Sequence, residues 1–231
     1  MMRPAQGVVA MALPPKEPRP SPPPSRQEMP RRAVALPPPR RAAEALLEAT
    51  VSVPWERPVH AARLAFLRRV ARPGEVSVHV ACGTDRLGFI DVAYGLTTIL
   101  TDVDSASLDI LAQQFAQVEA RFGPFPGTLQ CRPLPVEALT ADEGFPPSSV
   151  RHFTLLNLFN AHLYPPSDYP RLIDPLLSVI APGGSFFLTA SEADILMRRA
   201  RARQVGLRRL GEVQGYYDEN IELIQVHRTS A

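Results

Sequence analysis

The feature that most constrains the fold of this chain is a regular alternation of short apolar segments with amphipathic ones from Val76 onwards. Seven segments have the apolar character of strands, at 76–82, 97–103, 128–134, 151–158, 185–190, 207–214 and 221–227. Helical patterns lie between most of them, at 86–94, 105–122, 169–180 and 193–205. Because parallel strands need crossover connections, we predict an α/β fold with a doubly wound, mostly parallel seven-stranded sheet.

The clearest helical pattern runs from residue 105 to residue 122. Its apolar residues recur at spacings of three and four and form one face: Leu108, Leu111, Phe115, Val118 and Phe122. The last two strand segments are joined only by residues 215–220, so we expect them to form a hairpin at the sheet edge, with an antiparallel C-terminal strand.

The first 41 residues differ in composition from the rest, with 12 of the 26 prolines. Proline lacks an amide donor and disfavours helix and sheet, so residues 1–40 are predicted to be a disordered proline- and arginine-rich leader. This leader is either a tether or an interaction arm for a protein partner. Residues 41–231 form the predicted domain, including N-terminal helices within 41–72 that pack beside the first strand or cap a cofactor cleft.

The net charge and the cysteine content limit the kinds of function and the cellular location that we expect. The net charge is +2, and the first 41 residues hold eight basic and two acidic residues, so the remainder carries about −4. A mildly acidic body disfavours nucleic-acid binding, and no apolar run approaches the ~20 residues that span a membrane. Two cysteines, Cys82 and Cys131, give neither a disulfide framework nor a zinc pattern. We therefore expect a cytoplasmic protein without a structural metal.

The segment from Val78 to Gly88 is a strand that enters a turn of small residues before a helix. Such a turn lets backbone amides approach a ligand closely. Asp104 is predicted to close the second strand, where a carboxylate can hold a ribose diol. Asp102 is a competing candidate, and Asp104 can also cap the following helix, because the two roles can coexist.

Other nucleotide-binding motifs fit less well. Gly83 and Gly88 do not have the spacing of Gly-x-Gly-x-x-Gly, and the sequence contains no Gly-Lys-Ser/Thr of a P-loop. Nicotinamide enzymes and nucleotide triphosphatases are disfavoured.

From about Arg41 to Arg228 the chain resembles the class I S-adenosylmethionine-dependent methyltransferase family. The resemblance rests on Val80-Ala81-Cys82-Gly83-Thr84, on Asp104, on the segment 145–163 and on Ile180-Ala181-Pro182-Gly183-Gly184. It implies a methyltransferase-like fold and S-adenosylmethionine as the cofactor. The residues it implies for the cofactor are Ala81, Cys82, Gly83, Thr84, Asp85, Asp104, Asn157 and one near 135–137.

Three positions depart from the family pattern. His79 stands where the first strand usually has an acid, Asp85 replaces the last glycine of the first motif, and Leu134-Pro135 replaces the acid after the third strand. Asp85 either opposes the cofactor's carboxylate or pairs with its amino group in place of the missing acid.

Methyl transfer mainly needs alignment of a nucleophile with the sulfonium methyl. The predicted catalytic residues lie after the fourth strand and are His162, Asn157 and Tyr164; His162 is either a general base or a histidine that hydrogen-bonds a loop. The leading hypothesis is methyl transfer to a small-molecule acceptor. The alternative is a catalytically inactive methyltransferase-like domain that serves as a binding or scaffolding module, with the leader as its interaction arm.

Overall fold

The computed structural model describes residues 46–47, 50–51, 56–214 and 220–227. The predicted leader, residues 1–40, and most of the first predicted helical segment lie outside these residues. All described residues belong to one compact unit that spans residues 35–231. None of the described helices is both long enough and apolar enough to cross a membrane.

The predicted seven-stranded sheet is present, with the strand order β3-β2-β1-β4-β5-β7-β6. Strands β1 to β5 pair in parallel, whereas β7 lies antiparallel between β5 and β6. This topology confirms the predicted fold class. The strands are β1 Val76–Val80, β2 Thr97–Asp102, β3 Thr128–Pro133, β4 Val150–Leu155, β5 Ile180–Thr189, β6 Gly206–Gln214 and β7 Asn220–His227.

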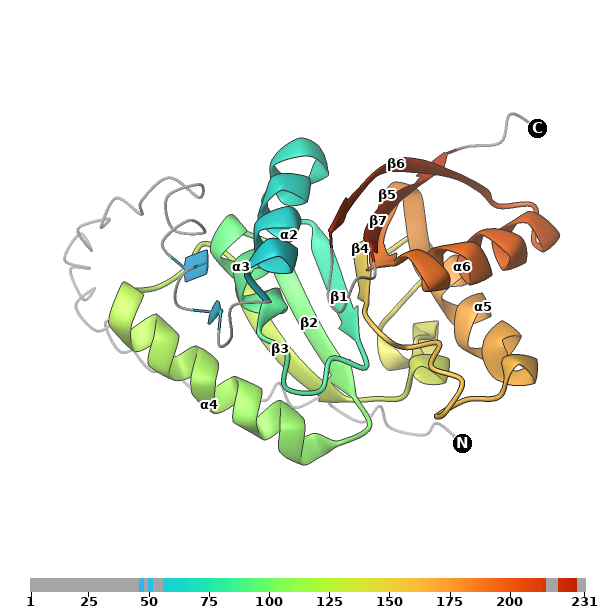
Figure 1. The fold of residues 1–231 in the computed structure, drawn as a ribbon. Helices are drawn as coiled ribbons and strands as arrows, with labels where there is room; N and C mark the ends of the chain where they lie inside the picture. Colours follow the sequence, from blue (N-terminus) through green and yellow to red (C-terminus); the bar gives the residue numbers. More distant parts are fainter. Residues whose placement is uncertain (1–45, 48–49, 52–55, 215–219, 228–231) are drawn as a thin grey trace, which may run out of the picture. The chain divides into compact units, whose positions relative to one another are not determined.

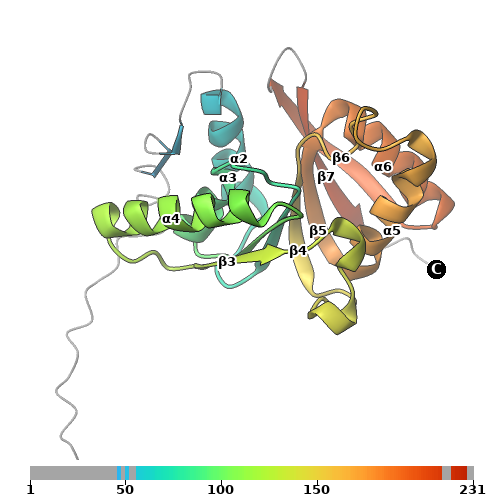
Figure 2. The same ribbon diagram turned by 90° about the horizontal axis from the view of Figure 1, so that it is seen from below.

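Helices cover both faces of the sheet. In Figure 1 and in the perpendicular view of Figure 2, α2, α3 and α4 lie on one face and α5 and α6 on the other. Three short 3-10 helices lie in the connections, and η1 and η2 follow β3. The helices are α2 Glu56–Val70, α3 Leu87–Tyr94, α4 Ser105–Phe122, η1 Val136–Ala138, η2 Ala141–Glu143, η3 Pro166–Asp168, α5 Tyr169–Val179 and α6 Ala190–Ala202.

Each face of the sheet has its own apolar core. On the α5 and α6 face, Phe153 and Phe186 from neighbouring strands stack with ring centroids 5.6 Å apart. On the other face, Phe66 of α2 packs against Phe187 of β5, and Phe89 of α3 belongs to the same cluster. Burial of aromatic side chains on both faces is what fixes the order of the layers.

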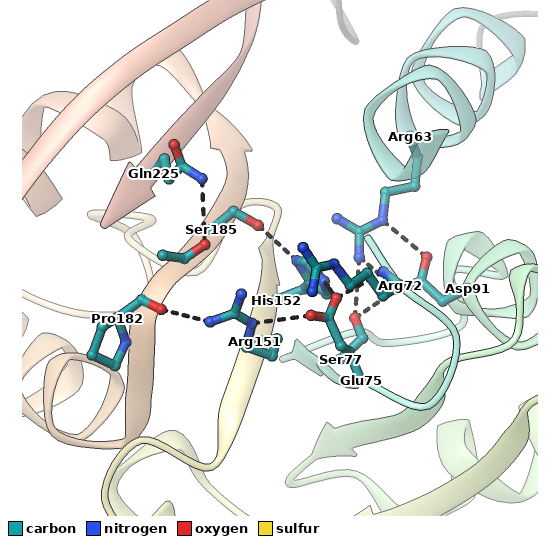
Figure 3. A network of polar contacts seen from close by, with 11 residues as sticks. Arg63, Arg72, Glu75, Ser77, Asp91, Arg151, His152, Pro182, Ser185 and Gln225 are labelled. Carbon is teal, nitrogen blue, oxygen red and sulfur yellow. Dashed lines mark hydrogen bonds and ion pairs between the residues drawn. The ribbon is translucent and has the colours of Figure 1, made fainter. Parts of the chain in front are cut away.

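Polar side chains also lie between the sheet and helices α2 and α3 (Figure 3). The guanidinium of Arg63 on α2 donates hydrogen bonds of 2.9 and 2.5 Å to the Asp91 carboxylate on α3, and both side chains are fully buried. Nearby, His152 of β4 bonds to Glu75 through Nε2 at 2.9 Å and to Ser185 of β5 through Nδ1 at 2.8 Å. These contacts therefore join α2, α3 and three neighbouring strands.

Several predicted boundaries were wrong. A helix was predicted for 169–180 and the next strand for 185–190, but α5 ends at Val179 and β5 begins at Ile180. The pairing of β4 with β5 shifts register in this stretch, and a Cβ on Gly184 would lie 2.8 Å from the carbonyl oxygens of Ala181 and Arg151. Gly184 is therefore required by a close backbone approach inside an irregular strand.

Helix α6 starts three residues earlier than expected, at Ala190 rather than Ala193. Thr189 and Glu192 form a capping box that fixes this start. The other predicted strands and helices agree with the observed ones within a few residues, and helix α4 agrees at both ends.

Candidate active site

The main pocket lies at the carboxyl ends of β1 and β4 and has a volume of about 340 Å³. This is the edge where ligands bind in parallel α/β sheets. Its lining includes the predicted turn residues and one residue of α2: Glu56, His79, Val80, Ala81, Cys82, Thr84, Asp85, Thr154, Leu156 and Asn157.

The predicted turn of small residues follows β1, and two of its residues have a left-handed backbone. Ala81 and Gly83 both have positive φ angles, 51° and 52°, a region that non-glycine residues rarely adopt. The strand ends at Val80, two residues earlier than predicted. The side chain of Asp85 accepts a hydrogen bond of 2.8 Å from the Leu87 amide at the start of α3, so it closes this turn.

The imidazole of His79 is hydrogen-bonded to a buried carboxylate. Its Nε2 lies 3.0 Å from the Asp91 carboxylate, which Arg63 and Ser77 also bond. Burial alone would raise the pKa of Asp91, but the charges of Arg63 and His79 and their hydrogen bonds hold it far below its usual range. His79 is therefore a buried residue of this polar cluster, and it also lines the main pocket.

A second, smaller hollow of about 30 Å³ adjoins the first, since both are lined by Val80 and Ala81. It lies beside the ends of β2 and β3. Its other lining residues are Asp102, Val103, Leu134, Pro135, Val136, Leu158 and Tyr164.

Asp102, not Asp104, closes β2. One carboxylate oxygen of Asp102 accepts a hydrogen bond from the Gly83 amide at 2.7 Å and the other accepts one from the Asp104 amide at 2.9 Å. Asp104 is the N-cap of α4: its exposed carboxylate accepts bonds from Ala106 N and Ser107 Oγ, and these bonds lower its pKa. The prediction that Asp104 closes the strand was wrong, and the alternative, the helix cap, is what the structure shows.

The three predicted catalytic residues are not brought together. Asn157 lines the main pocket and has a left-handed backbone with φ 67°. Tyr164 lines the smaller hollow instead. His162 is exposed and lines neither cavity, and its backbone amide donates to Asn160 Oδ1. His162 therefore lies outside both cavities, and its bond within the loop involves its backbone rather than its imidazole.

Cys82 lies in the site but is not a ready nucleophile. Burial raises the pKa of its thiol well above the usual value, and the nearby carboxylates of Asp102 and Asp85 raise it further. Both cysteines are free. Among the described residues, no group of three His, Cys, Asp or Glu side chains is placed to hold a metal ion.

Sequence reasoning missed two residues of the pocket. Glu56 is the first residue of α2 and lies more than twenty positions before the turn; nothing in the local pattern marks it as part of a site. Thr154 lies on β4 and is 3% exposed, and its buried hydroxyl has no hydrogen-bond partner among the described residues. A buried orphan hydroxyl that lines a cavity is available to a ligand.

The sheet order, the small-residue turn after β1 and the carboxylate at the end of β2 together define the class I Rossmann-like methyltransferase fold. The chain is similar to a solved SAM-dependent methyltransferase from Methanosarcina mazei, with TM-score 0.55 and 11% identity over 70% of this chain and 96% of that one. It is also similar to TrmN from Thermus thermophilus, with TM-score 0.54 and 15% identity over 72% and 48% of the two chains.

A third similar structure is a precorrin-6y C5,15-methyltransferase from Geobacter metallireducens, with TM-score 0.52 and 10% identity over 78% of this chain and 91% of that one. No protein-family model matches the chain, and no curated protein matches its sequence. At these identities the likeness establishes the fold.

Proposed function

We propose that this protein binds S-adenosylmethionine across the two adjoining cavities and transfers its methyl group to a small-molecule acceptor. The observation that carries the proposal is the charge of the main pocket within this fold. Its ionisable lining residues include Glu56 and Asp85, and no lysine or arginine is among the described residues that line it. S-adenosylmethionine carries a sulfonium and an ammonium against one carboxylate, so a pocket with two acids suits its net positive charge.

The methionine end of the cofactor would occupy the main pocket. His79 is committed to Asp91 and cannot replace the acid that usually stands in the first strand. Asp85 has one oxygen on the Leu87 amide and a side chain that is 31% exposed. This arrangement supports the alternative in which Asp85 pairs with the cofactor's amino group.

The adenosine end would lie toward the smaller hollow. The Asp102 oxygens each accept one backbone bond and each keep a lone pair that can accept a ribose hydroxyl. Val103, which is 70% exposed, and Pro135 offer apolar surface for a flat base. Ligand pockets usually measure roughly 300–1,000 Å³, so Leu158 and Tyr164 must shift for the base to enter.

The cofactor supplies an electrophilic methyl on a positively charged sulfur; the protein's task is to align the acceptor. Asn157 and Thr154 present an amide and an unpaired hydroxyl at the pocket, and both can orient a polar acceptor. With His162 outside the site, an acceptor whose nucleophilic atom carries no proton to be removed is favoured, because its methylation needs no general base.

The charges near the cleft favour a small acceptor over RNA. Glu56, Asp85 and Asp102 would repel a phosphate backbone. Three arginines near α6 and β6 are ion-paired: Arg199 and Arg203 contact Asp174, and Arg209 contacts Asp194 and Glu222. These pairs reduce the positive charge that this part of the chain offers to a nucleic acid.

The acceptor is tested by incubating the full chain with S-adenosylmethionine labelled in its methyl group and with three separate fractions: metabolites, RNA and protein. We expect label to move into the metabolite fraction only. Label in RNA or protein would contradict a small-molecule acceptor but would still show methyltransferase activity.

One observation favours the second candidate, a binding module without catalysis. Tyr164 and Leu158 leave only about 30 Å³ where the base would lie. If that hollow never opens, cofactor cannot bind, and the domain would act through partners instead, with the proline-rich leader proposed as its interaction arm. Absence of any labelled product, together with absence of cofactor binding, would select this candidate.

A further inference from the structure

Glu192 takes part in a helix cap, yet its side chain is almost completely buried. It is the third residue of α6 and forms a capping box with Thr189: its Oε2 accepts from the Thr189 amide at 3.1 Å and from the Thr189 hydroxyl at 2.9 Å. Such a cap usually lies at the surface, yet Glu192 is only 2% exposed. A buried carboxylate is costly unless several donors satisfy it, so its remaining oxygen needs a partner.

That partner comes from a distant segment. Oε1 of Glu192 accepts a hydrogen bond of 3.1 Å from the backbone amide of Phe159, in the loop that follows β4. Burial raises the pKa of Glu192, and the amides of Phe159, Thr189 and Leu158 oppose that rise. One side chain thus holds the start of α6 and the loop after β4 together through amides and a hydroxyl.

The peptide at Phe159 is fixed on its other side as well. Its carbonyl accepts a hydrogen bond of 3.1 Å from the Tyr169 hydroxyl, and the two rings lie 5.5 Å apart. Removal of the Glu192 oxygen would leave a buried amide without a partner, which favours rearrangement of the loop.

The loop that Glu192 holds lies beside both cavities. Leu156 and Asn157 line the main pocket, whereas Leu158 and Tyr164 line the smaller hollow. Asn157 has a left-handed backbone, a conformation that costs energy unless neighbouring contacts maintain it. The bond to Phe159, two residues further on, is such a contact.

We propose that Glu192 is a positioning residue: its carboxylate latches the loop after β4 and thereby sets the placement of Asn157 at the main pocket and of Leu158 at the smaller hollow. The link to cofactor binding rests on the proposed function. The latch itself does not, because it concerns only the conformation of residues 156–159.

The test compares two variants of the full chain. Glu192→Gln keeps the size of the side chain but replaces one acceptor oxygen with an amide donor, so either Phe159 or Thr189 loses its partner. Thr189→Ala is the matched control, because it damages the same helix cap and leaves the bond to Phe159 intact. Hydrogen exchange of the Phe159 amide and the affinity for S-adenosylhomocysteine are measured for both.

We expect exchange of the Phe159 amide to be faster by at least about tenfold in Glu192→Gln and unchanged in Thr189→Ala. We also expect Glu192→Gln, but not Thr189→Ala, to weaken binding of S-adenosylhomocysteine by about tenfold. Equal exchange of the Phe159 amide in wild type, Glu192→Gln and Glu192→Asp, or an equal loss of affinity in Glu192→Gln and Thr189→Ala, would overturn the latch.

Two further results are informative. If Glu192→Gln does not fold, Glu192→Asp, which keeps the charge but shortens the reach, takes its place with the same expected exchange. If the wild-type chain binds no S-adenosylhomocysteine, the proposed function fails, while exchange of the Phe159 amide still decides whether the latch exists.

Discussion

The backbone amide of Gly83, in the turn after β1, donates a hydrogen bond of 2.7 Å to the carboxylate of Asp102 at the end of β2. This bond fixes the two strand ends that border both cavities. It also places the Asp102 oxygens at the junction where a ribose would lie under the proposed function. The same carboxylate accepts from the Asp104 amide, so Asp102 organises the turn and the start of α4 together.

We therefore expect Asp102→Ala to weaken the binding of S-adenosylhomocysteine by about 100-fold, because two hydrogen bonds to a charged acceptor are lost. Calorimetric titration measures the change. Asp104→Ala is the control: its carboxylate caps α4 and is exposed, so stability falls slightly and affinity stays within about twofold. Greater loss of affinity in Asp104→Ala than in Asp102→Ala would return the ribose role to Asp104.

Asp85 gives a prediction about ligand choice. Asp85→Asn keeps an oxygen for the Leu87 amide but removes the charge. We expect it to weaken binding of S-adenosylhomocysteine by about tenfold and to leave binding of methylthioadenosine, which lacks the α-amino group of the amino-acid part, nearly unaffected. Both affinities are measured by the same titration, and an equal effect on the two ligands would show that Asp85 does not contact the amino group.

The buried ion pair between Arg63 and Asp91 gives a prediction about stability. Asp91→Asn would leave the Arg63 guanidinium without its charge partner in a site that water does not reach. We expect the free energy of unfolding to fall by about 3–5 kcal/mol, measured by urea denaturation. Asp174→Asn, which breaks the half-exposed pair with Arg199, should cost much less.

His152 makes stability depend on pH. Burial and the charge of Arg63 lower its pKa despite the bond to Glu75, so the unfolded chain takes up a proton first as the pH falls. The contribution of His152 is complete above its unfolded pKa of about 6.5 and is lost as the pH falls below that value. Urea denaturation at pH 7 and at pH 5 should show a decrease that is smaller in His152→Gln. A decrease of the same size in His152→Gln and in the wild type would show that another group causes the pH dependence.

The sequence determined the fold better than the site, for a physical reason. Helix α4 matches its predicted range at both ends because its apolar spacing, Asp104 cap and final Gly123 are local signals. The predicted start of α6 was three residues too late. Its actual start is set by the capping box of Thr189 and Glu192, whose spacing is visible in the sequence. The predicted turn and Asn157 do line the main pocket.

The remaining features of the site depend on contacts between distant segments. Glu56 reaches the pocket from α2, and Glu192 reaches Phe159 across 33 positions. No local pattern encodes either contact. His162 shows the reverse error: its residue type suggested a base, but the loop after β4 turns it to the surface.

The central claim is that the two cavities hold S-adenosylmethionine. Its most direct test is calorimetric titration of the folded full chain with S-adenosylmethionine and S-adenosylhomocysteine. We expect saturable binding of both ligands at one site with affinities of about micromolar, and a clear loss in Asp102→Ala. No heat from either ligand, with protein shown by circular dichroism to be folded, would contradict the cofactor site and favour the non-catalytic binding module.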